Sequence, residues 1–183
     1  MIHFEKDMQL EAGSVQLRAI CDADRENVFA LLTNEEVAKT YMLPLFESEA
    51  QVQALFERLQ QFSAEPDRFV YGIYLQNRFI GLINEVWRSD SEIELGYAVL
   101  PAYHNRGYAT AALGAAIRAL FAYGFTAVKA AAFEENAASM RVMEKCGMTD
   151  IHCSEYVEYR GQRRRCICYR IWKEGEICKI ISS

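Results

Sequence analysis

The residues best suited to chemistry lie in one segment that begins as a strand, breaks at a proline and resumes as a helix. Apolar and polar side chains alternate over residues 92–99, which is the period of a half-buried strand. Pro101 lacks the N–H that a strand ladder needs, so the strand is expected to end there. From Ala109 onward, apolar residues recur with the period of a helix. Residues 104–110 are therefore predicted to be a turn that opens a helix.

A turn of this kind is suited to binding an anion. The first N–H groups of a helix have no acceptor within the helix, and the helix dipole favours negative charge there. Gly107 has no Cβ, so a bulky anion can approach its backbone, and Arg106 adds a positive charge. The same glycine is also compatible with a tight strand-to-helix turn that binds no ligand.

Two segments together resemble the GNAT N-acetyltransferase superfamily, and more narrowly its RimJ/RimL branch. The acyl-CoA-binding signature of the superfamily is Gln/Arg-x-x-Gly-x-Gly/Ala. This chain has His104-Asn105-Arg106-Gly107-Tyr108-Ala109, followed by Thr110. His104 departs from the usual first position, which varies in the branch. Residues 136–148 are similar to the branch's Asn-x-x-Ser-x-Arg-Val-x-Glu-Lys-x-Gly-Phe/Met segment, with Asn136 as a helix N-cap and Gly147 as a C-cap.

Composition favours one soluble globular domain over residues 1–183. The 183 residues are 51% hydrophobic and carry a formal net charge of -5. The negative charge argues against direct nucleic-acid binding and mildly favours cationic substrates. The chain has no signal-peptide pattern and no apolar run near the roughly 20 residues that span a bilayer, so a cytoplasmic protein without membrane contact is expected. Cys166 and Cys168 are one pair short of a structural zinc site, so no metal is expected.

The predicted element order is β-α-α-β-β-β-α-β-α-β-β, a mixed α/β sheet in a single domain. The GNAT resemblance implies the same order over residues 14–173, with a central strand that splays from its neighbour. Residues 1–13 are expected to be a lead-in anchored by Ile2 and Phe4, and residues 174–183 a frayed or partner-dependent tail. Asp22 is predicted to cap the first helix, and residues 48–51 to form a capping box for the second.

The resemblance also implies a reaction. Acetyl-CoA would donate its acetyl group to a primary amine, either a protein N-terminal α-amine of the ribosomal-protein type or a small amine. The amine would attack directly in a ternary complex. The expected cofactor-binding residues are Ala98, Val99 and Leu100 for the pantetheine amides, Asn136 beside them, and His104, Asn105, Arg106, Gly107, Tyr108, Ala109 and Thr110 for the pyrophosphate. A backbone N–H near Val99 would polarise the thioester carbonyl.

Two catalytic tasks remain, and each has a candidate residue. An amine is mostly protonated at neutral pH, so a base is needed, and Glu94 on the central strand is the candidate. Glu92, Glu85 and water remain alternatives for the base. Many GNAT enzymes protonate the departing thiolate with a tyrosine seven residues after the asparagine, where this chain has Met143. In the RimJ/RimL branch a serine takes this role, here Ser139, although a helix serine can also bond back to a carbonyl.

Other interpretations stay open at the level of sequence. The acceptor is expected between residues 33–47, residues 69–88 and the last hairpin, where Tyr41, Met42, Phe46 and Trp87 either shape its site or pack in the core. Residues 163–165, three arginines, either attract an acidic partner or protect a strand edge. A different class of protein, a non-catalytic acyl-CoA-binding module, is the main alternative to an enzyme that is a monomer or homodimer. A P-loop is excluded because the chain lacks Gly-x-x-x-x-Gly-Lys-Ser/Thr.

Overall fold

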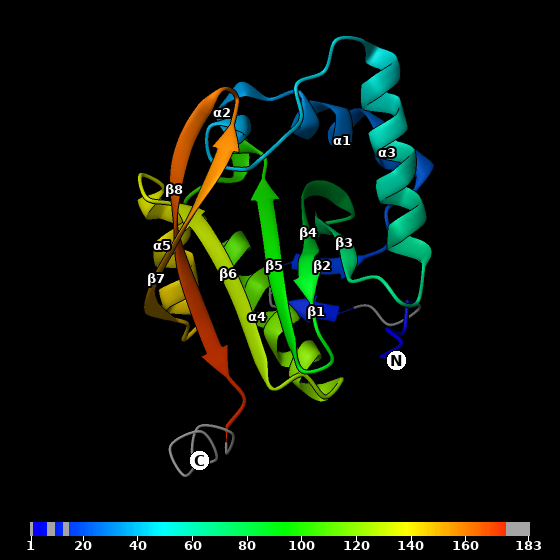
Figure 1. Cartoon of the computed structure of the whole chain (residues 1–183). Helices are drawn as coiled ribbons and strands as arrows, with labels where there is room; N and C mark the ends of the chain where they lie inside the picture. Colours follow the sequence, from blue (N-terminus) through cyan, green and yellow to red (C-terminus); the bar gives the residue numbers. More distant parts are fainter. Residues whose placement is uncertain (1, 7–9, 13–14, 175–183) are drawn as a thin grey trace.

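The structure is a computed structural model that describes residues 2–6, 10–12 and 15–174. Within these residues, eight strands form one mixed sheet in the order β1-β2-β3-β4-β5-β6-β8-β7 (Figure 1). The strands are β1 (Leu10–Ala12), β2 (Val15–Arg18), β3 (Val70–Leu75), β4 (Arg78–Arg88), β5 (Glu92–Val99), β6 (Ala127–Phe133), β7 (Thr149–Tyr159) and β8 (Gln162–Trp172). The helices are α1 (Arg25–Leu32), α2 (Glu35–Ala38), α3 (Glu49–Ala64), α4 (Tyr108–Ala122) and α5 (Ala137–Lys145), with 3-10 turns at Asp22–Asp24 and Pro101–Tyr103.

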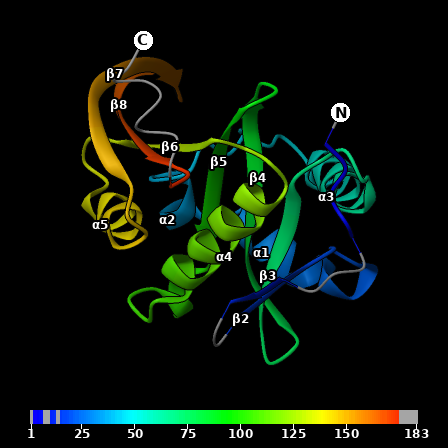
Figure 2. The same ribbon diagram turned by 90° about the horizontal axis from the view of Figure 1, so that it is seen from below.

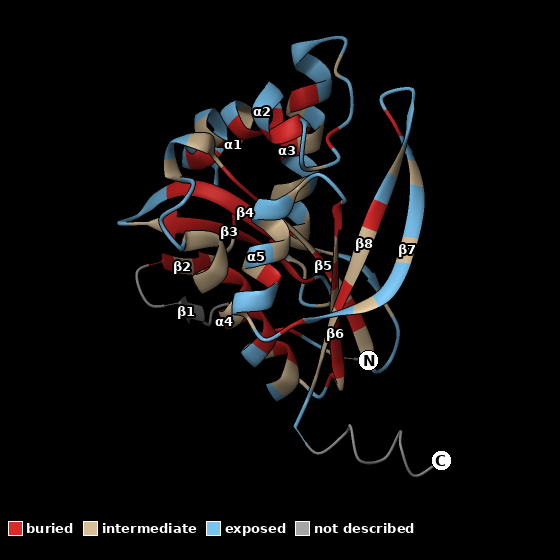
Figure 3. Ribbon diagram, turned by 90° about the vertical axis from the view of Figure 1, so that its left-hand side faces the viewer, coloured by how far each residue is buried: buried red, intermediate tan, exposed pale blue. Residues whose placement is uncertain are grey.

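Helices cover both faces of the sheet and create two hydrophobic cores (Figure 2). The α4 and α5 face buries one side of β5, including Leu95 and Val99. The face of α1, α2 and α3 buries the other side of the sheet, including Leu82 and Ala98. Because both faces are covered, the strict alternation predicted for residues 92–99 breaks down at Ala98, which is buried. Figure 3 shows this double coverage as continuous burial along most of β3 and the first half of β4.

The sheet opens in its middle. All neighbouring strands are antiparallel except β5 and β6, which run parallel and pair only from Glu92 with Ala127 to Leu95 with Ala130. Beyond that point β5 follows β4 as far as Val99, while β6 follows β8 as far as Phe133. The splayed central strand expected from the resemblance is therefore confirmed, and Figure 1 shows the two strands diverging.

The predicted order is confirmed, and the structure adds β1 and α2 to it. Phe4 is buried against the core, as expected for an anchor. The capping box at residues 48–51 is wrong: the Ser48 side chain makes no capping bond, and Gln51 Oε1 accepts from the Glu47 N–H at 2.7 Å. The longer glutamine side chain reaches one residue past the N-cap. The predicted tail lies, apart from Glu174, outside the described residues.

The predicted cap at Asp22 is also wrong, because a 3-10 turn precedes α1 and Asp24 stands at the N-cap position, where its side chain makes no capping bond to α1. The Asp24 carboxylate accepts from the Cys21 N–H at 2.9 Å and from the Tyr74 hydroxyl at 2.6 Å. Asp24 is only 5% exposed, so this pair ties the start of α1 to β3. The Arg18 guanidinium lies 3.9 Å from the Tyr74 ring centroid and offsets the buried negative charge.

We predict that Tyr74→Phe lowers the free energy of unfolding by about 1–3 kcal/mol, because the buried Asp24 carboxylate loses a donor. Urea denaturation measures the change. Tyr156→Phe is the control, since Tyr156 is exposed and its hydroxyl supports no buried group. Equal stability of the two variants would contradict the structural role of the Tyr74–Asp24 pair.

Candidate active site

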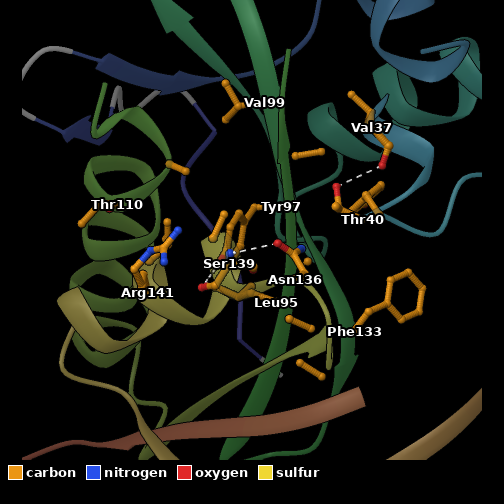
Figure 4. Close-up of a pocket in the computed structure, with 18 of the residues that line it drawn as sticks. Val37, Thr40, Leu95, Tyr97, Val99, Thr110, Phe133, Asn136, Ser139 and Arg141 are labelled. Carbon is orange, nitrogen blue, oxygen red and sulfur yellow. Dashed lines mark hydrogen bonds between the residues drawn. The ribbon is translucent and has the colours of Figure 1, made fainter. Parts of the chain in front are cut away.

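A cavity of about 720 Å³ occupies the opening between β5 and β6, a size typical of small-molecule sites. Its walls come from the start of α4, from α5, from β5 and β6, from the end of β4, and from the segment that follows α2. Figure 4 shows Thr110, Ser139 and Arg141 together on one side of the cavity, and Val37, Thr40 and Phe133 on the other. The cavity thus connects the two faces of the sheet through the gap in its middle.

The backbone edge of β5 faces this cavity. The Leu100 N–H donates to the Ile80 carbonyl of β4 at 2.8 Å. The N–H and C=O groups of successive residues in a strand point alternately to its two sides. Because those of Leu100 face β4, those of Tyr97 and Val99 point away from β4 and into the opening. His104 Nε2–H donates to the Val99 carbonyl at 2.7 Å, so that carbonyl already has a partner. Of the three residues expected to hold the pantetheine, Ala98 and Val99 line the cavity and Leu100 does not.

The turn before α4 presents free backbone N–H groups. Gly107 is the N-cap of α4 with φ of +80°, and a Cβ placed there would have no atom within 4 Å. The first helical hydrogen bond is donated by Ala111 to Gly107, so the three N–H groups before Ala111 have no helical acceptor. Of the predicted turn residues, Arg106 is exposed and does not line the cavity. Those that line it are His104, Asn105, Gly107, Tyr108, Ala109 and Thr110.

Two cations in the cavity wall were missed in the sequence reasoning. Arg141 and Lys145 lie one helical turn apart on α5, and both line the cavity. The Cys146 thiol donates to the Thr110 carbonyl at 3.4 Å, which brings the end of α5 beside the start of α4. The positive charges therefore lie near the free N–H groups of the turn. The i,i+4 spacing of the two cations was the signal available in the sequence.

Ser139 and Tyr97 form a hydrogen-bonded pair at the cavity. Asn136 is the N-cap of α5, and its Oδ1 accepts from the Ser139 N–H at 3.1 Å. Ser139 Oγ lies 2.7 Å from the Tyr97 hydroxyl, which also lies 3.2 Å from the Ser139 carbonyl. The contact of Ser139 is thus with Tyr97 of the neighbouring strand β5 rather than backward within the helix. Burial raises the pKa of Tyr97, so this hydroxyl stays protonated. Sequence reasoning missed Tyr97 because the pairing depends on tertiary structure.

Glu94 lines the cavity from the opposite face of β5. Burial raises its pKa, and the charge of Glu155 adds to this effect while Lys129 opposes it. The two alternative carboxylates are held in ion pairs: Glu92 with Lys129 and Arg170, and Glu85 with two arginines. Within the described ranges, Glu94 makes no ion pair. Of the three glutamates, it is therefore the one that faces the cavity without a fixed partner.

The remaining candidate features involve charge and thiols. Arg164 pairs with Glu135, and Arg165 with Glu134 at 2.7 Å, so two of the three consecutive arginines have partners. In the described part of the chain, no three His, Cys, Asp or Glu side chains are arranged to hold a metal ion. The cysteines that the structure describes are free thiols. None of the described helices combines the length and apolarity needed to cross a bilayer.

Comparison with known proteins identifies the family to which this chain belongs. A profile of the acetyltransferase (GNAT) domain matches residues 14–149. The chain belongs to this family, and the class of protein is an acetyl-CoA-dependent N-acetyltransferase of the RimJ/RimL type.

Individual relatives agree with this assignment. The uncharacterized N-acetyltransferase YoaA of Bacillus subtilis is 29% identical over 143 residues, which cover 75% of this chain and 81% of YoaA. A Salmonella typhimurium acetyltransferase that modifies the N-terminal serine of ribosomal protein L7/L12 has a similar fold. It matches with a TM-score of 0.78 at 15% identity, covering 91% of this chain and 100% of its own. RimL in complex with coenzyme A matches with a TM-score of 0.77 at 16% identity, and the match covers 90% of this chain and 98% of the RimL chain.

We predict that Gly107→Val weakens CoA binding by at least about tenfold, because its side chain would enter the open space above the free N–H groups. Isothermal titration with CoA measures the effect. Gly124→Val is a matched control: Gly124 also has a positive φ and open space, but it follows the far end of α4. Both variants strain the backbone, so an equal loss of affinity in both would count against a ligand site at the turn.

Proposed function

We propose that this protein transfers the acetyl group of acetyl-CoA to a primary amine in the opening between β5 and β6, by direct attack in a ternary complex. One observation carries the proposal. A candidate acid, Ser139, and a candidate base, Glu94, lie on opposite faces of the strand whose free backbone edge lines the cavity. Acceptor and cofactor can then approach the same gap from opposite sides of the sheet. The acceptor classes are a protein N-terminal α-amine, as for the Salmonella enzyme, or a small amine.

The cofactor would bind along residues that already face the cavity. The turn at residues 104–110 would hold the pyrophosphate through its free N–H groups. Arg141 and Lys145 would pair with the phosphates, and exposed Arg106 would add positive potential beside them. The pantetheine arm would add as a short strand along the free edge at Tyr97 and Val99. The side-chain NH2 group of Asn136 would donate to this arm, because the side-chain oxygen already accepts the capping hydrogen bond from Ser139.

The reaction then proceeds in balanced steps. Glu94 accepts a proton from the ammonium group of the acceptor, directly or through one water. The neutral nitrogen attacks the thioester carbon, whose oxygen accepts a hydrogen bond from the Val99 N–H. The carbon–sulfur bond breaks, and the thiolate takes the hydroxyl proton of Ser139. The amide nitrogen loses its second proton to water, and water returns a proton to the serine oxygen. Tyr97 has a single proton, and its shorter contact is to Ser139 Oγ. Donation to that oxygen leaves the serine proton free to point at the sulfur.

Glu94→Gln is expected to lower kcat/KM at neutral pH by about 10²–10⁴, the usual contribution of a general base. The base must be ionised, so wild-type activity should rise as pH increases through the raised pKa of Glu94. The variant should lose this acidic limb of the pH profile. Glu92→Gln is the control, since Glu92 lies on the same face but is paired with Lys129. Retention of full activity and the same pH profile in Glu94→Gln would assign the base elsewhere.

Tyr97→Phe is expected to lower kcat roughly tenfold, the energy of about one hydrogen bond, with the KM for acetyl-CoA unchanged. In a Ser139→Ala background the same change should have no further effect, because Tyr97 acts through the serine. Tyr169→Phe is the matched control, since Tyr169 is a strand tyrosine that bonds Glu144 of α5 at 3.1 Å. Additive losses in the double variant would show that Tyr97 does not act through Ser139.

The function itself is tested by CoA release from acetyl-CoA in the presence of peptides with free N-termini and small primary amines. The proposal predicts release that depends on the amine and yields the acetylated amine by mass spectrometry. Tight binding of acetyl-CoA with no turnover on any amine would instead support a non-catalytic CoA-binding module.

A further inference from the structure

The side of the cavity that faces the acceptor is built mainly from apolar side chains. These come from three separate parts of the chain: α2 with the segment after it, the end of β4, and β6. Figure 4 shows Val37 and Phe133 on this side, across the cavity from Ser139 and Arg141. We name this surface the acceptor wall, and it consists of Val37, Tyr41, Met42, Val86 and Phe133.

The polar side chains beside the acceptor wall already have partners in the protein. The Thr40 hydroxyl donates to a backbone carbonyl at 3.2 Å, and the Tyr41 hydroxyl donates to Asn84 Oδ1 at 2.6 Å. The amide nitrogen of Asn84 donates to a backbone carbonyl at 2.9 Å, and Glu85 is paired with two arginines. Glu94 is therefore the charged side chain of this part of the cavity that stays free to meet an acceptor.

The geometry of β4 and β5 brings the acceptor wall onto the strand that carries Glu94. The register pairs Glu85 with Leu95 and Trp87 with Glu94, so Val86 is the extra residue of a β-bulge. A Cβ at Gly96 would lie 3.2 Å from the Val86 side chain and 3.3 Å from Tyr41. The absence of a side chain at Gly96 thus lets Val86 and Tyr41 pack directly over β5, two residues from the candidate base.

Part of the acceptor wall is exposed to solvent. Met42 is 51% exposed and Val86 is 56% exposed, and both line the cavity. Large apolar side chains gathered at the rim of a cavity commonly mark a binding surface, because a ligand removes them from water. Leu45 is more exposed still, at 68%, but it does not line the cavity. A substitution at Leu45 therefore serves as a control, because it removes an exposed apolar side chain away from the cavity.

We infer that the acceptor carries an apolar substituent beside its primary amine: a hydrophobic N-terminal residue or a hydrophobic small amine. This inference rests on the proposed function and specifies its substrate class. One carboxylate meets one ammonium group, and the acceptor wall meets the substituent. A polyamine or aminoglycoside would leave its other cationic or hydroxyl groups without partners at the acceptor wall. Glu155, a carboxylate whose charge raises the pKa of Glu94, is exposed on β7 and does not line the cavity.

The test compares acceptors that differ in this substituent alone. Peptides that begin with Met, Leu or Phe are matched with the same peptides beginning with Ser or Gly, and phenethylamine is matched with ethanolamine and spermidine. We expect kcat/KM to be at least about tenfold higher for the apolar member of a pair, the discrimination usual for an apolar pocket. A preference in the peptide arm, the small-amine arm or both supports the inference and identifies the source of the amine.

Variants assign the preference to the acceptor wall. The double variant Met42→Ser/Val86→Ser should reduce the preference at least several-fold while the KM for acetyl-CoA stays unchanged, and Leu45→Ser should retain the full preference. Thermal unfolding confirms that each variant is folded. Equal or better turnover of the polar members in both arms overturns the inference and leaves the proposed function intact. An unchanged preference in the double variant does the same. Absence of turnover with every amine overturns both.

Discussion

The arrangement of the candidate site depends on one backbone edge of β5, which the sheet leaves unpaired. After Leu95, β5 keeps its antiparallel partner β4 but loses β6, so the backbone groups of Tyr97 and Val99 face a cavity instead of a strand. Buried backbone groups in proteins are almost always paired, so a free edge inside a fold is a place for an extended ligand. His104 satisfies the Val99 carbonyl and leaves the remaining groups available.

The same opening explains the arrangement of the surrounding groups. Because β5 is covered on both faces, its successive side chains point alternately to the two sides of the sheet. Tyr97 packs toward α5, and Glu94 points to the opposite face. The chain then turns at Pro101 and Gly107, which places the start of α4 and its free N–H groups at the end of the same edge. The proposed anion site, the edge proposed for the pantetheine arm and the proposed base thus follow one another along a single strand and turn. The proposed acid, Ser139, contacts Tyr97 of this strand from α5. The acceptor wall is the surface that we propose to distinguish one amine from another.

Several local features could be predicted from the sequence, but two helix caps and the features that depend on tertiary packing could not. Strand periodicity, the glycine before α4 and the cap at Asn136 follow from rules that act over a few residues, and the structure has all three. The capping box failed because Ser and Gln at the right spacing do not specify which N–H the longer side chain reaches. The roles of Tyr97 and Arg141 stayed hidden because each depends on how α5 packs beside β5 and α4. The sequence favoured Glu94 as the base and left Glu92 and Glu85 as alternatives. In the described residues the structure gives both alternatives fixed cations and Glu94 none.

The central claim is that acetyl-CoA lies along the free edge of β5 with its pyrophosphate at the start of α4. Residue-resolved amide hydrogen exchange, measured with and without CoA, tests it most directly. The account predicts that CoA slows exchange at Val99 and at residues 107–110, where the N–H groups lack partners in the free protein. Exchange at Leu100, whose N–H is already bonded to β4, should change far less. Saturating CoA that left the amides of Val99 and residues 107–110 unprotected would contradict the account.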